Sequence, residues 1–199
     1  NLQRQIVHLD AAIGAPKVES AAATIALLNP GVKIIQHKTR LVAANVMEII
    51  AGYDIVCDGS DNFSTRYLLN DACYLARKKL VAASLLRFEG QLSTFRAFDR
   101  DPAGTGDPCY RCLFREAPPP DLVPRCEEAG ILGTVAGVLG TLQATETIKE
   151  ILGLGRSLSG RLMLYDALEG TSRTINVPRD PSCPLCGVQP SIKDLSGHK

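Results

Sequence analysis

Two pairs of cysteines carry the most specific chemical signal in this sequence. Cys109 and Cys112 form one Cys-x-x-Cys pair, and Cys183 and Cys186 form a second pair near the end of the chain. Zn²⁺ binds four soft ligands at the corners of a tetrahedron, and each short pair supplies two thiolates without strain. Because no histidine lies in either pair and all four positions are filled, we expect a structural zinc site. A thioredoxin-like redox pair, which needs only one pair, and coincidence are the alternatives.

A second chemical signal lies in residues 53–71, which combine an apolar strand, a glycine turn and the start of a helix. Asp61 and Asn62 then follow the carboxyl end of a strand, where α/β proteins bind their ligands. A carboxylate at this place could hold Mg²⁺ beside a polyphosphate. The alternative is that Asp61 or Ser60 merely caps the helix.

Three further side chains are candidates for chemistry. Cys126 lies outside the two pairs in a proline-containing loop, so it is either a nucleophile or an inert surface thiol. Arg4 and Lys17 are cations without an obvious structural task. Together with Asp61 they could form a set for phosphate chemistry, with cations for the oxygens and a carboxylate for the metal. Solvated surface charge is the alternative for each of them.

Helical and strand patterns alternate in the first half of the chain, and these elements must position the candidate residues. We expect helices over 15–28, 43–50 and after residue 60, and strands over 32–36, 53–57, 80–84 and 87–98, with Gly90 as a possible bulge. Such alternation predicts an α/β fold with a mostly parallel sheet and helices on both faces.

The second half has a different pattern. Residues 99–125 are rich in Asp, Pro and Gly, which predicts a long irregular segment around the first cysteine pair. A helix is expected over about 134–152, ending at Gly153, and its small residues would permit close packing or a subunit contact. Two paired strands are expected over 161–167 and 171–177, which adds an antiparallel C-terminal part.

Composition excludes several classes of partner. The chain has 45% hydrophobic residues and a net charge of +1, with a mean hydropathy of +0.04. We therefore expect no nucleic-acid partner and no membrane. Seven cysteines, four of them in Cys-x-x-Cys pairs, fit a reducing compartment and a metal better than a disulfide framework, so we expect a cytoplasmic protein.

Taken together, these motifs resemble one family, the adenylating, E1-like enzymes of the MoeB and ThiF type, which activate ubiquitin-like sulfur-carrier proteins. The matching residues are spread over nearly the whole chain: Asn1 to Gln5, Gly14 to Lys17, Asn29 with Pro30, Ser60 to Asn62 with Arg66, Arg87 to Gln91, Cys109 to Leu113, Cys126 to Gly130, Gln143 with Ala144, Ile148 with Lys149, Tyr165 to Ala167, and Cys183 to Cys186.

The resemblance implies a Rossmann-like fold that binds ATP, Mg²⁺ and the Gly-Gly C-terminus of a small ubiquitin-like sulfur-carrier protein, whose terminal glycine it adenylates. By this resemblance, the residues that bind the nucleotide would be Asn1, Arg4, Gln5 and Lys17. Asp61 and Asn62 would bind Mg²⁺ and the nucleotide. The zinc ligands would be Cys109, Cys112, Cys183 and Cys186. Cys126 matches a loop cysteine that forms a thioester or persulfide-linked intermediate in some members and is not needed for adenylation in MoeB-like members.

The resemblance also implies a homodimer and a persulfide donor, either a sulfurtransferase or a cysteine desulfurase. The family's Gly-rich loop precedes the position where this sequence begins, so we expect an N-terminally truncated chain that binds ATP poorly by itself. We expect one domain over 1–199, with a nucleotide-binding part over 1–98 and a crossover loop, zinc pairs and carrier-binding part over 99–199.

Two competing functions stay open at this point. A zinc-stabilised module that binds a ubiquitin-like tail without catalysis would fit the truncated chain. A nicotinamide dehydrogenase would fit the α/β pattern alone, but it explains neither the cysteine pairs nor the cluster of Asp61, Asn62 and Arg66. Among carrier pathways, the sequence does not distinguish molybdopterin, thiamine, cysteine or tRNA thiolation.

Overall fold

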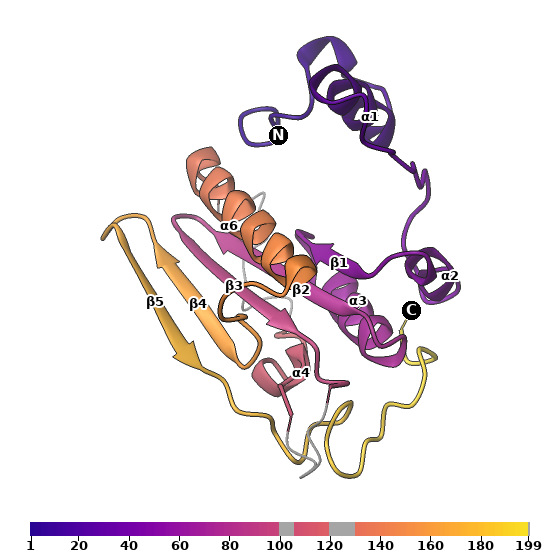
Figure 1. Ribbon diagram of the computed structural model, residues 1–199, viewed down its shortest axis with the longest axis vertical. Coiled ribbons are helices and arrows are strands. Elements are labelled where there is room, and N and C mark those ends of the chain that lie inside the picture. Colours follow the sequence, from indigo (N-terminus) through magenta and orange to yellow (C-terminus); the bar gives the residue numbers. More distant parts are fainter. Residues whose placement is uncertain (100–105, 120–129, 199) are drawn as a thin grey trace. The chain divides into compact units, whose positions relative to one another are not determined.

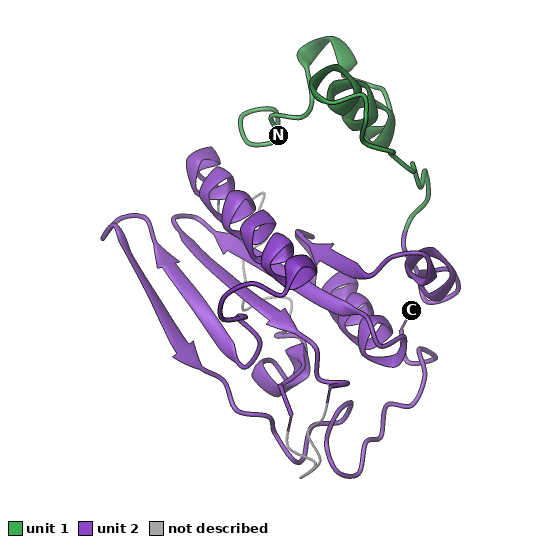
Figure 2. Ribbon diagram, viewed as in Figure 1, with its two compact units in different colours: residues 1–40 green, residues 41–199 purple. Residues whose placement is uncertain are grey.

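A computed structural model describes residues 1–99, 106–119 and 130–198. The chain divides into two compact units, Asn1–Arg40 and Leu41–Lys199, and each is described here by itself (Figure 2). The single domain expected from the sequence stays a prediction. In the described ranges, no helix combines the length and the apolar character needed to cross a membrane.

The first unit contains a short 3-10 helix, η1 (Asp10–Ala12), and the helix α1 (Lys17–Leu28). The predicted helix over 15–28 is confirmed, and its first turn follows Pro16, whose fixed φ suits that position. The predicted strand over 32–36 is wrong, because these residues form a bend followed by irregular chain and belong to no sheet. Val32 and Ile35 are exposed, so this apolar run has neither a partner strand nor a core in the unit.

The second unit is built on a five-stranded sheet with the strand order β1-β2-β3-β4-β5 (Figure 1). Its elements are α2 (Val46–Ala51), β1 (Ile55–Asp58), α3 (Phe63–Leu75), β2 (Lys79–Leu86), β3 (Glu89–Phe95), α4 (Tyr110–Leu113), α6 (Gly133–Leu152), β4 (Arg161–Asp166) and β5 (Thr171–Asn176). The α/β class and the antiparallel C-terminal strand pair are confirmed.

The expectation of a mostly parallel sheet is wrong for the described strands. Only β1 and β2 pair in parallel, whereas the pairs β2–β3, β3–β4 and β4–β5 are antiparallel. Parallel strands need a long crossover, which α3 supplies between β1 and β2. Between β2 and β3 there are only Arg87 and Phe88, and Arg87 adopts a left-handed conformation with φ 54° that closes a tight hairpin.

Helices cover both faces of the sheet, as predicted. Successive residues of β2 point to opposite faces, so Leu80 packs with α2 and α3, while Val81 packs with α6. Figure 1 shows α6 crossing in front of the sheet and α3 behind it. Ile55 and Val56 of β1 each pack against one of these two cores.

Gly90 does not form the predicted bulge, because the register between β2 and β3 is continuous through the pair Leu85–Gly90. Its role is to leave room for α6. A Cβ at this position would lie 2.5 Å from Cδ2 and 2.6 Å from Cγ of Leu139, a fully buried residue of α6. The absence of a side chain on β3 therefore sets the close approach of helix and sheet.

A buried carboxylate fixes the position of α6. Glu146 accepts hydrogen bonds from Thr94 Oγ1 at 3.0 Å and from the Leu158 backbone N–H at 2.6 Å, and it forms an ion pair with Lys149. The helix ends at Gly153, which has a φ of 65° and caps it as predicted. These bonds connect α6 with β3 and with the segment that leads into β4.

We predict that Gly90→Ala destabilises the protein by about 1–3 kcal/mol, because Leu139 must leave its rotamer to avoid the new methyl group. The measurement is the free energy of unfolding in urea. Gly137→Ala is the matched control, since this exposed glycine of α6 has open space around it and the change should raise helix stability by up to about 1 kcal/mol. Equal stability of Gly90→Ala and the wild type would contradict the packing argument.

Candidate functional site

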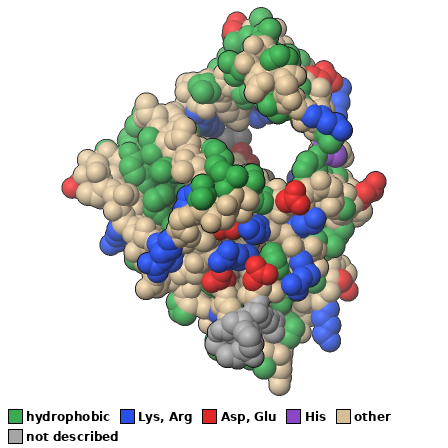
Figure 3. Space-filling view, viewed as in Figure 1, with side chains coloured by type: hydrophobic (Ala, Val, Ile, Leu, Met, Phe, Trp, Pro, Cys, Tyr) green, Lys and Arg blue, Asp and Glu red, His purple; other side chains and the backbone are tan. Residues whose placement is uncertain are grey.

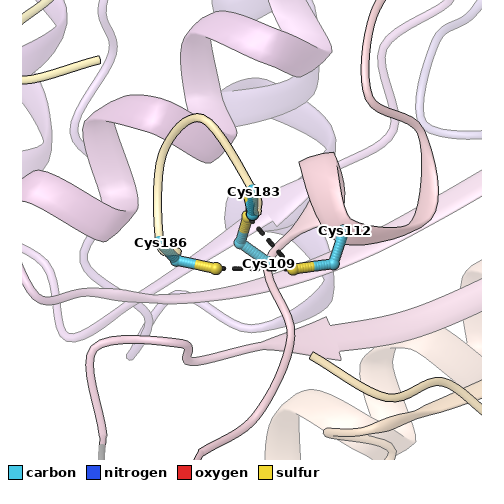
Figure 4. A group of neighbouring side chains, drawn as sticks. All are labelled: Cys109, Cys112, Cys183 and Cys186. Carbon is cyan, nitrogen blue, oxygen red and sulfur yellow. Dashed lines mark hydrogen bonds between the residues drawn. The ribbon is translucent and has the colours of Figure 1, made fainter. Parts of the chain in front are cut away.

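The four cysteines of the two pairs converge in the second unit, although 74 residues separate Cys109 from Cys183. Cys109 precedes α4 and Cys112 lies within it, while Cys183 and Cys186 come from a turn near the C-terminus (Figure 4). Their sulfur atoms all lie within 4.8 Å of one another. The sequence therefore predicted correctly that these residues form one cluster.

The geometry of this four-cysteine cluster fits a tetrahedral metal ion. The sulfur–sulfur distances are 4.0 Å for Cys109–Cys112, 3.5 Å for Cys109–Cys183 and 3.4 Å for Cys112–Cys186. A tetrahedron with Zn–S bonds of about 2.3 Å has edges of about 3.8 Å. Four thiolate donors are also the set that Zn²⁺ prefers. The donor set and its spacing thus agree with a structural zinc site.

The turn of the second pair is tight and well bonded. The Gly187 N–H donates to Cys183 O at 3.0 Å, and a Cβ at Gly187 would lie only 2.4 Å from that oxygen. The backbone N–H of Asp180 donates to the sulfur of Cys112 at 3.4 Å. Hydrogen bonding from Cys109 lowers the pKa of Cys112 to about 7, and the same neighbours lower the pKa of Cys183. Hydrogen bonds within the cluster also raise the pKa of Cys109 and of Cys186, so the four thiols titrate as one set.

The first pair is held in place by α3. Asp71, which is fully buried, accepts two hydrogen bonds from Arg111, from Nε at 2.8 Å and from a terminal nitrogen at 2.7 Å. His198 Nε2 lies 2.8 Å from the same carboxylate. Beside it, Asn70 Oδ1 accepts the backbone N–H of Tyr110 at 2.9 Å. Two adjacent residues of α3 thus fix α4, which carries Cys112.

The other candidate site lies at the carboxyl end of β1. Asn62 caps α3, because its Oδ1 accepts hydrogen bonds from the Thr65 backbone N–H at 2.9 Å and from Ser64 Oγ at 2.8 Å. Asp61 is exposed, and its Oδ1 accepts a hydrogen bond from Asn62 Nδ2 at 3.4 Å. The capping role considered for Asp61 therefore belongs to Asn62, and the Asp61 carboxylate remains accessible to a ligand.

Arg66 lies one turn into α3 and supports the same turn. Its guanidinium donates to Ser60 O from Nε at 3.2 Å and from a terminal nitrogen at 2.8 Å. The hydroxyl oxygen of Ser60 is buried and has no hydrogen-bond partner among the residues that the structure describes. A buried hydroxyl without a partner is uncommon and is typical of sites that receive a ligand or a water molecule.

A small pocket opens beside this turn, and it contains residues that the sequence interpretation missed. It leaves about 20 Å³ of room for a group the size of a water molecule. Asp58, Arg66 and Tyr110 are among its polar lining residues, and its walls include Ala82, Phe95, Leu113, Phe114 and Leu162. Burial raises the pKa of Tyr110, and a hydrogen bond to Arg66 acts in the opposite direction. The signal for Asp58 was its place as the first polar residue after the apolar strand.

Other predicted site residues lie elsewhere in the chain. Asn1, Arg4, Gln5 and Lys17 belong to the first unit, where the Asn1 carbonyl accepts the backbone N–H groups of Arg4 and Gln5, and Lys17 begins α1. Cys126 lies outside the described residues. The functional assignments of all these residues therefore stay predictions.

The fold and the two sites define a class of protein, an α/β domain with a small pocket at the end of β1 and a four-cysteine cluster that could hold a metal ion. Comparisons with known proteins make the class specific. The sequence profile of the ThiF family matches residues 1–185, and the chain belongs to this family.

Three curated relatives illustrate the match. The chain is 44% identical to a protein named sulfur carrier protein adenylyltransferase from Thermus thermophilus and covers 73% of it. It is 48% identical to the SAMP-activating enzyme E1 of Haloferax volcanii, covering 70% of that protein. The chain is also 46% identical to the adenylyltransferase and sulfurtransferase MOCS3 of Bos taurus, but it spans only 42% of that longer protein. Between 98% and 100% of this chain is aligned in each case.

Solved structures share the fold. The structure of E. coli MccB with the peptide MccA superposes with a TM-score of 0.74 at 20% identity, over 94% of this chain and 55% of that one. The structure of MccB with ATP gives a TM-score of 0.71 at 18% identity and covers 93% of this chain. At this level of identity the likeness supports the E1-like fold alone.

We predict that Asp71→Asn speeds the transfer of zinc from the purified protein to a chromogenic chelator, because Arg111 loses its ionic partner and α4 loosens. The variant Asp71→Ala should lower the free energy of unfolding by about 3–5 kcal/mol, which is the cost of breaking a buried ion pair.

Glu146→Gln is the matched control for Asp71→Asn. It also neutralises a buried, paired carboxylate, but one that holds α6 and does not contact α4. Equal rates of zinc transfer from the two variants would show that Asp71 has no particular influence on the metal site.

Proposed function

We propose that this protein adenylates the C-terminal glycine of a small ubiquitin-like sulfur-carrier protein with ATP. The observation that carries the proposal is the arrangement at the end of β1, where the accessible Asp61 carboxylate lies three residues from Asp58, which lines the small pocket. Membership of the ThiF family and the names of the relatives support this reading over a binding module without catalysis. Which pathway the protein serves depends on which carrier it adenylates, and molybdenum cofactor biosynthesis is one of the candidate pathways.

In the proposed reaction, the carrier's terminal carboxylate attacks the α-phosphorus of ATP, which yields an acyl-adenylate and releases pyrophosphate. A carboxylate is ionised at neutral pH, so the step needs no general base. The protein contributes alignment and neutralisation of charge. Arg4 and Lys17 offset the charge of the phosphate oxygens, while Asn1 and Gln5 bind the nucleotide.

Asp61 and Asn62 are the residues we assign to Mg²⁺ and the nucleotide. When bound, Mg²⁺ would neutralise phosphate charge beside Asp61, since hard oxygen ligands and substrate phosphates form its usual sites. Asn62 is occupied with capping α3 through Oδ1, so its amide nitrogen is the group left for the nucleotide. Arg66 holds the Ser60 carbonyl and thereby fixes the direction of the turn that presents Asp61.

Cys126 is proposed for the step after adenylation. The outer sulfur of a persulfide, carried on Cys126 or on an external donor such as a sulfurtransferase or a cysteine desulfurase, would attack the activated carbonyl with loss of AMP. A second thiol would then reduce the resulting acyl disulfide and release the thiocarboxylate. Zn²⁺ would be held by Cys109, Cys112, Cys183 and Cys186 and would supply structural stability alone, because its four protein ligands leave no open position.

We also propose a homodimer in the cytoplasm. Figure 3 shows hydrophobic side chains gathered over α6, where Ile148, Ile151 and Leu152 are exposed. Their spacing of three and four residues places them on one side of the helix, as in a packed helix. None of the six described cysteines forms a disulfide, which agrees with a reducing compartment. One functional domain over 1–199, with nucleotide-binding and carrier-binding parts meeting near residue 98, completes the proposal.

We predict that Asp61→Ala lowers ATP–pyrophosphate exchange by about 100-fold in the full-length protein, since the reaction loses a charged group at the phosphates. The assay contains a sulfur carrier ending in Gly-Gly. Asp54→Ala is the matched control, because Asp54 is an exposed carboxylate just before the other end of β1. Unchanged exchange in the Asp61 variant would remove that residue from the site. Absence of exchange by the wild type with every carrier tested would overturn the proposed function.

A second prediction separates adenylation from sulfur transfer. In Cys126→Ala, pyrophosphate exchange should stay within about 2-fold of the wild type, because the first step does not use the thiol. Formation of the carrier thiocarboxylate, followed by mass spectrometry, should fall. Full thiocarboxylate formation by the variant would assign the sulfur to an external donor alone.

A further inference from the structure

One side chain of α6, Gln143, reaches the carboxyl end of β1. It lies between Leu139, which packs against Gly90, and Glu146, which bonds to β3, on the stripe of the helix that faces the sheet. These two neighbours fix the register of α6 against the sheet. They therefore also fix where the amide of Gln143 lies.

The amide nitrogen of Gln143 has two hydrogens and two acceptors. Nε2 donates to Asp58 O at 2.8 Å and to Val81 O at 2.9 Å. Because both acceptors are carbonyl oxygens, only the nitrogen of the amide can face them. Asp58 ends β1 and Val81 belongs to β2, so one side chain joins the two strands where their parallel pairing ends, at Asp58 and Ala82.

The position of β1 in the sheet makes this contact important. In the described sheet β1 is an edge strand of four residues, paired with β2 alone. A short strand with one neighbour opens locally at low cost, because few hydrogen bonds must break. Thr147, one turn further along α6, lies 3.2 Å from the thiol of Cys57 and donates to Gln143 O at 2.8 Å. The helix therefore supports the end of this edge strand from one side.

The hydrogen bonds of the turn over residues 58–61 start from the residue that Gln143 holds. Asp58 Oδ1 accepts the Ser60 backbone N–H at 2.8 Å, and Ser60 O accepts the guanidinium of Arg66 at 2.8 Å. Asn62 then caps α3 through Oδ1. The residues on both sides of Asp61 thus fix the backbone, whereas the Asp61 carboxylate is exposed and accepts a long hydrogen bond from Asn62 Nδ2 at 3.4 Å.

We propose that Gln143 is a positioning residue for adenylation, which holds the end of β1 so that the turn presents the Asp61 carboxylate to Mg²⁺ and the nucleotide. This inference rests on the proposed function and adds to it a residue that acts through the backbone of Asp58. A displacement of about 1 Å caused by a change far from the chemistry can cost about 100-fold in rate. An amide is needed here, because a carboxylate would set its oxygens against two carbonyl oxygens and an apolar side chain would leave both carbonyls without this donor.

The first test is Gln143→Met, which keeps the length of the side chain and removes both donors. Full-length protein is assayed by ATP–pyrophosphate exchange with a sulfur carrier ending in Gly-Gly. We expect the rate at saturating substrates to fall by about 10- to 100-fold and the Mg²⁺ concentration for half-maximal rate to rise, because Asp61 is misplaced. The KM for the carrier should stay within about 2-fold of the wild type.

A double variant shows whether Gln143 acts through Asp61. In the background of Asp61→Ala, Gln143→Met should change pyrophosphate exchange by less than about 2-fold, because the group that it positions is already missing. A residue that only stabilises the fold would lower the rate by the same factor in both backgrounds. Equal factors in the two backgrounds would therefore overturn the proposal.

A second measurement does not depend on activity. Hydrogen–deuterium exchange is followed by mass spectrometry on peptides that cover residues 58–62. In Gln143→Met these amides should exchange about 5- to 10-fold faster, the effect of losing roughly one hydrogen bond at the end of β1. Unchanged protection of the turn would contradict the proposal. Gln143→Asn keeps an amide but is one methylene too short to reach both carbonyl oxygens, so it should show the same effects if Gln143→Met does not fold.

Thr94→Val is the matched control. It keeps nearly the same shape and removes the 3.0 Å hydrogen bond from Thr94 Oγ1 to Glu146, a contact of α6 with β3 instead of β1. This variant should lower the free energy of unfolding but leave the Mg²⁺ dependence and the protection of the turn unchanged. Equal effects of Thr94→Val and Gln143→Met would overturn the proposal, because any loosening of α6 would then suffice. Absence of pyrophosphate exchange by the wild type with every carrier would instead overturn the proposed function, and the protection of the turn would still decide whether Gln143 holds it.

Discussion

The need of a buried carboxylate for a cation organises the second unit. Asp71 is removed from water and pairs with Arg111, which attaches α4 to α3. Glu150, near the end of α6, pairs with Lys79 of β2 and Arg96 just after β3. Burial by itself would raise the pKa of Glu150, but its hydrogen-bonded and cationic neighbours together hold that pKa below its usual range. Breaking such a pair leaves an uncompensated charge, so these contacts specify which elements lie together.

The same need of buried polar groups for partners distinguishes the turn after β1 from the elements that hold the fold together. Where a carboxylate holds the fold together, the chain supplies its partners, as with Glu146 and its three donors. Asp58 and Ser60 lie in one turn, where Asp58 Oδ1 accepts the Ser60 N–H and the buried Ser60 hydroxyl has no partner among the described residues. Natural sequences are locally consistent except where function requires otherwise. A buried polar atom without a hydrogen-bond partner at the end of β1 therefore agrees with a binding site for substrate at this place.

Local patterns predicted the elements well, and pairing between strands less well. The period of α1, α3 and α6 was readable because each helix buries one stripe or ends at a marked residue such as Gly153. An apolar run such as 32–36 has the same composition as a strand, but only a partner strand can make it one. The antiparallel turn of the sheet after β2 depends on the left-handed conformation of Arg87, which its residue type does not reveal.

For the sites, the cysteine pairs were predictable because ligand type and spacing encode a tetrahedral cluster without reference to the fold. Asp61 and Asn62 were predictable from their place after a strand. Asp58 was not predictable. It stands out only because it is buried without an ion pair among the described residues, and pairing between distant charges cannot be read from one sequence. Tyr110 was hidden between Cys109 and Arg111 and reaches the pocket only because α4 packs against α3.

The metal cluster and the pocket share one element, so the term structural understates the cluster's contribution. The helix α4 has four residues, too few to be stable by itself. Cys109 and Cys112 anchor its two ends to the cluster, Arg111 anchors its side to Asp71, and Tyr110, Leu113 and Phe114 line the pocket. Tyr110 and Leu113 are thus next to an anchor, and Phe114 is two residues from Cys112. A change that loosens the cluster must move the pocket wall, which couples metal binding to the shape of the site without any direct contact between metal and substrate.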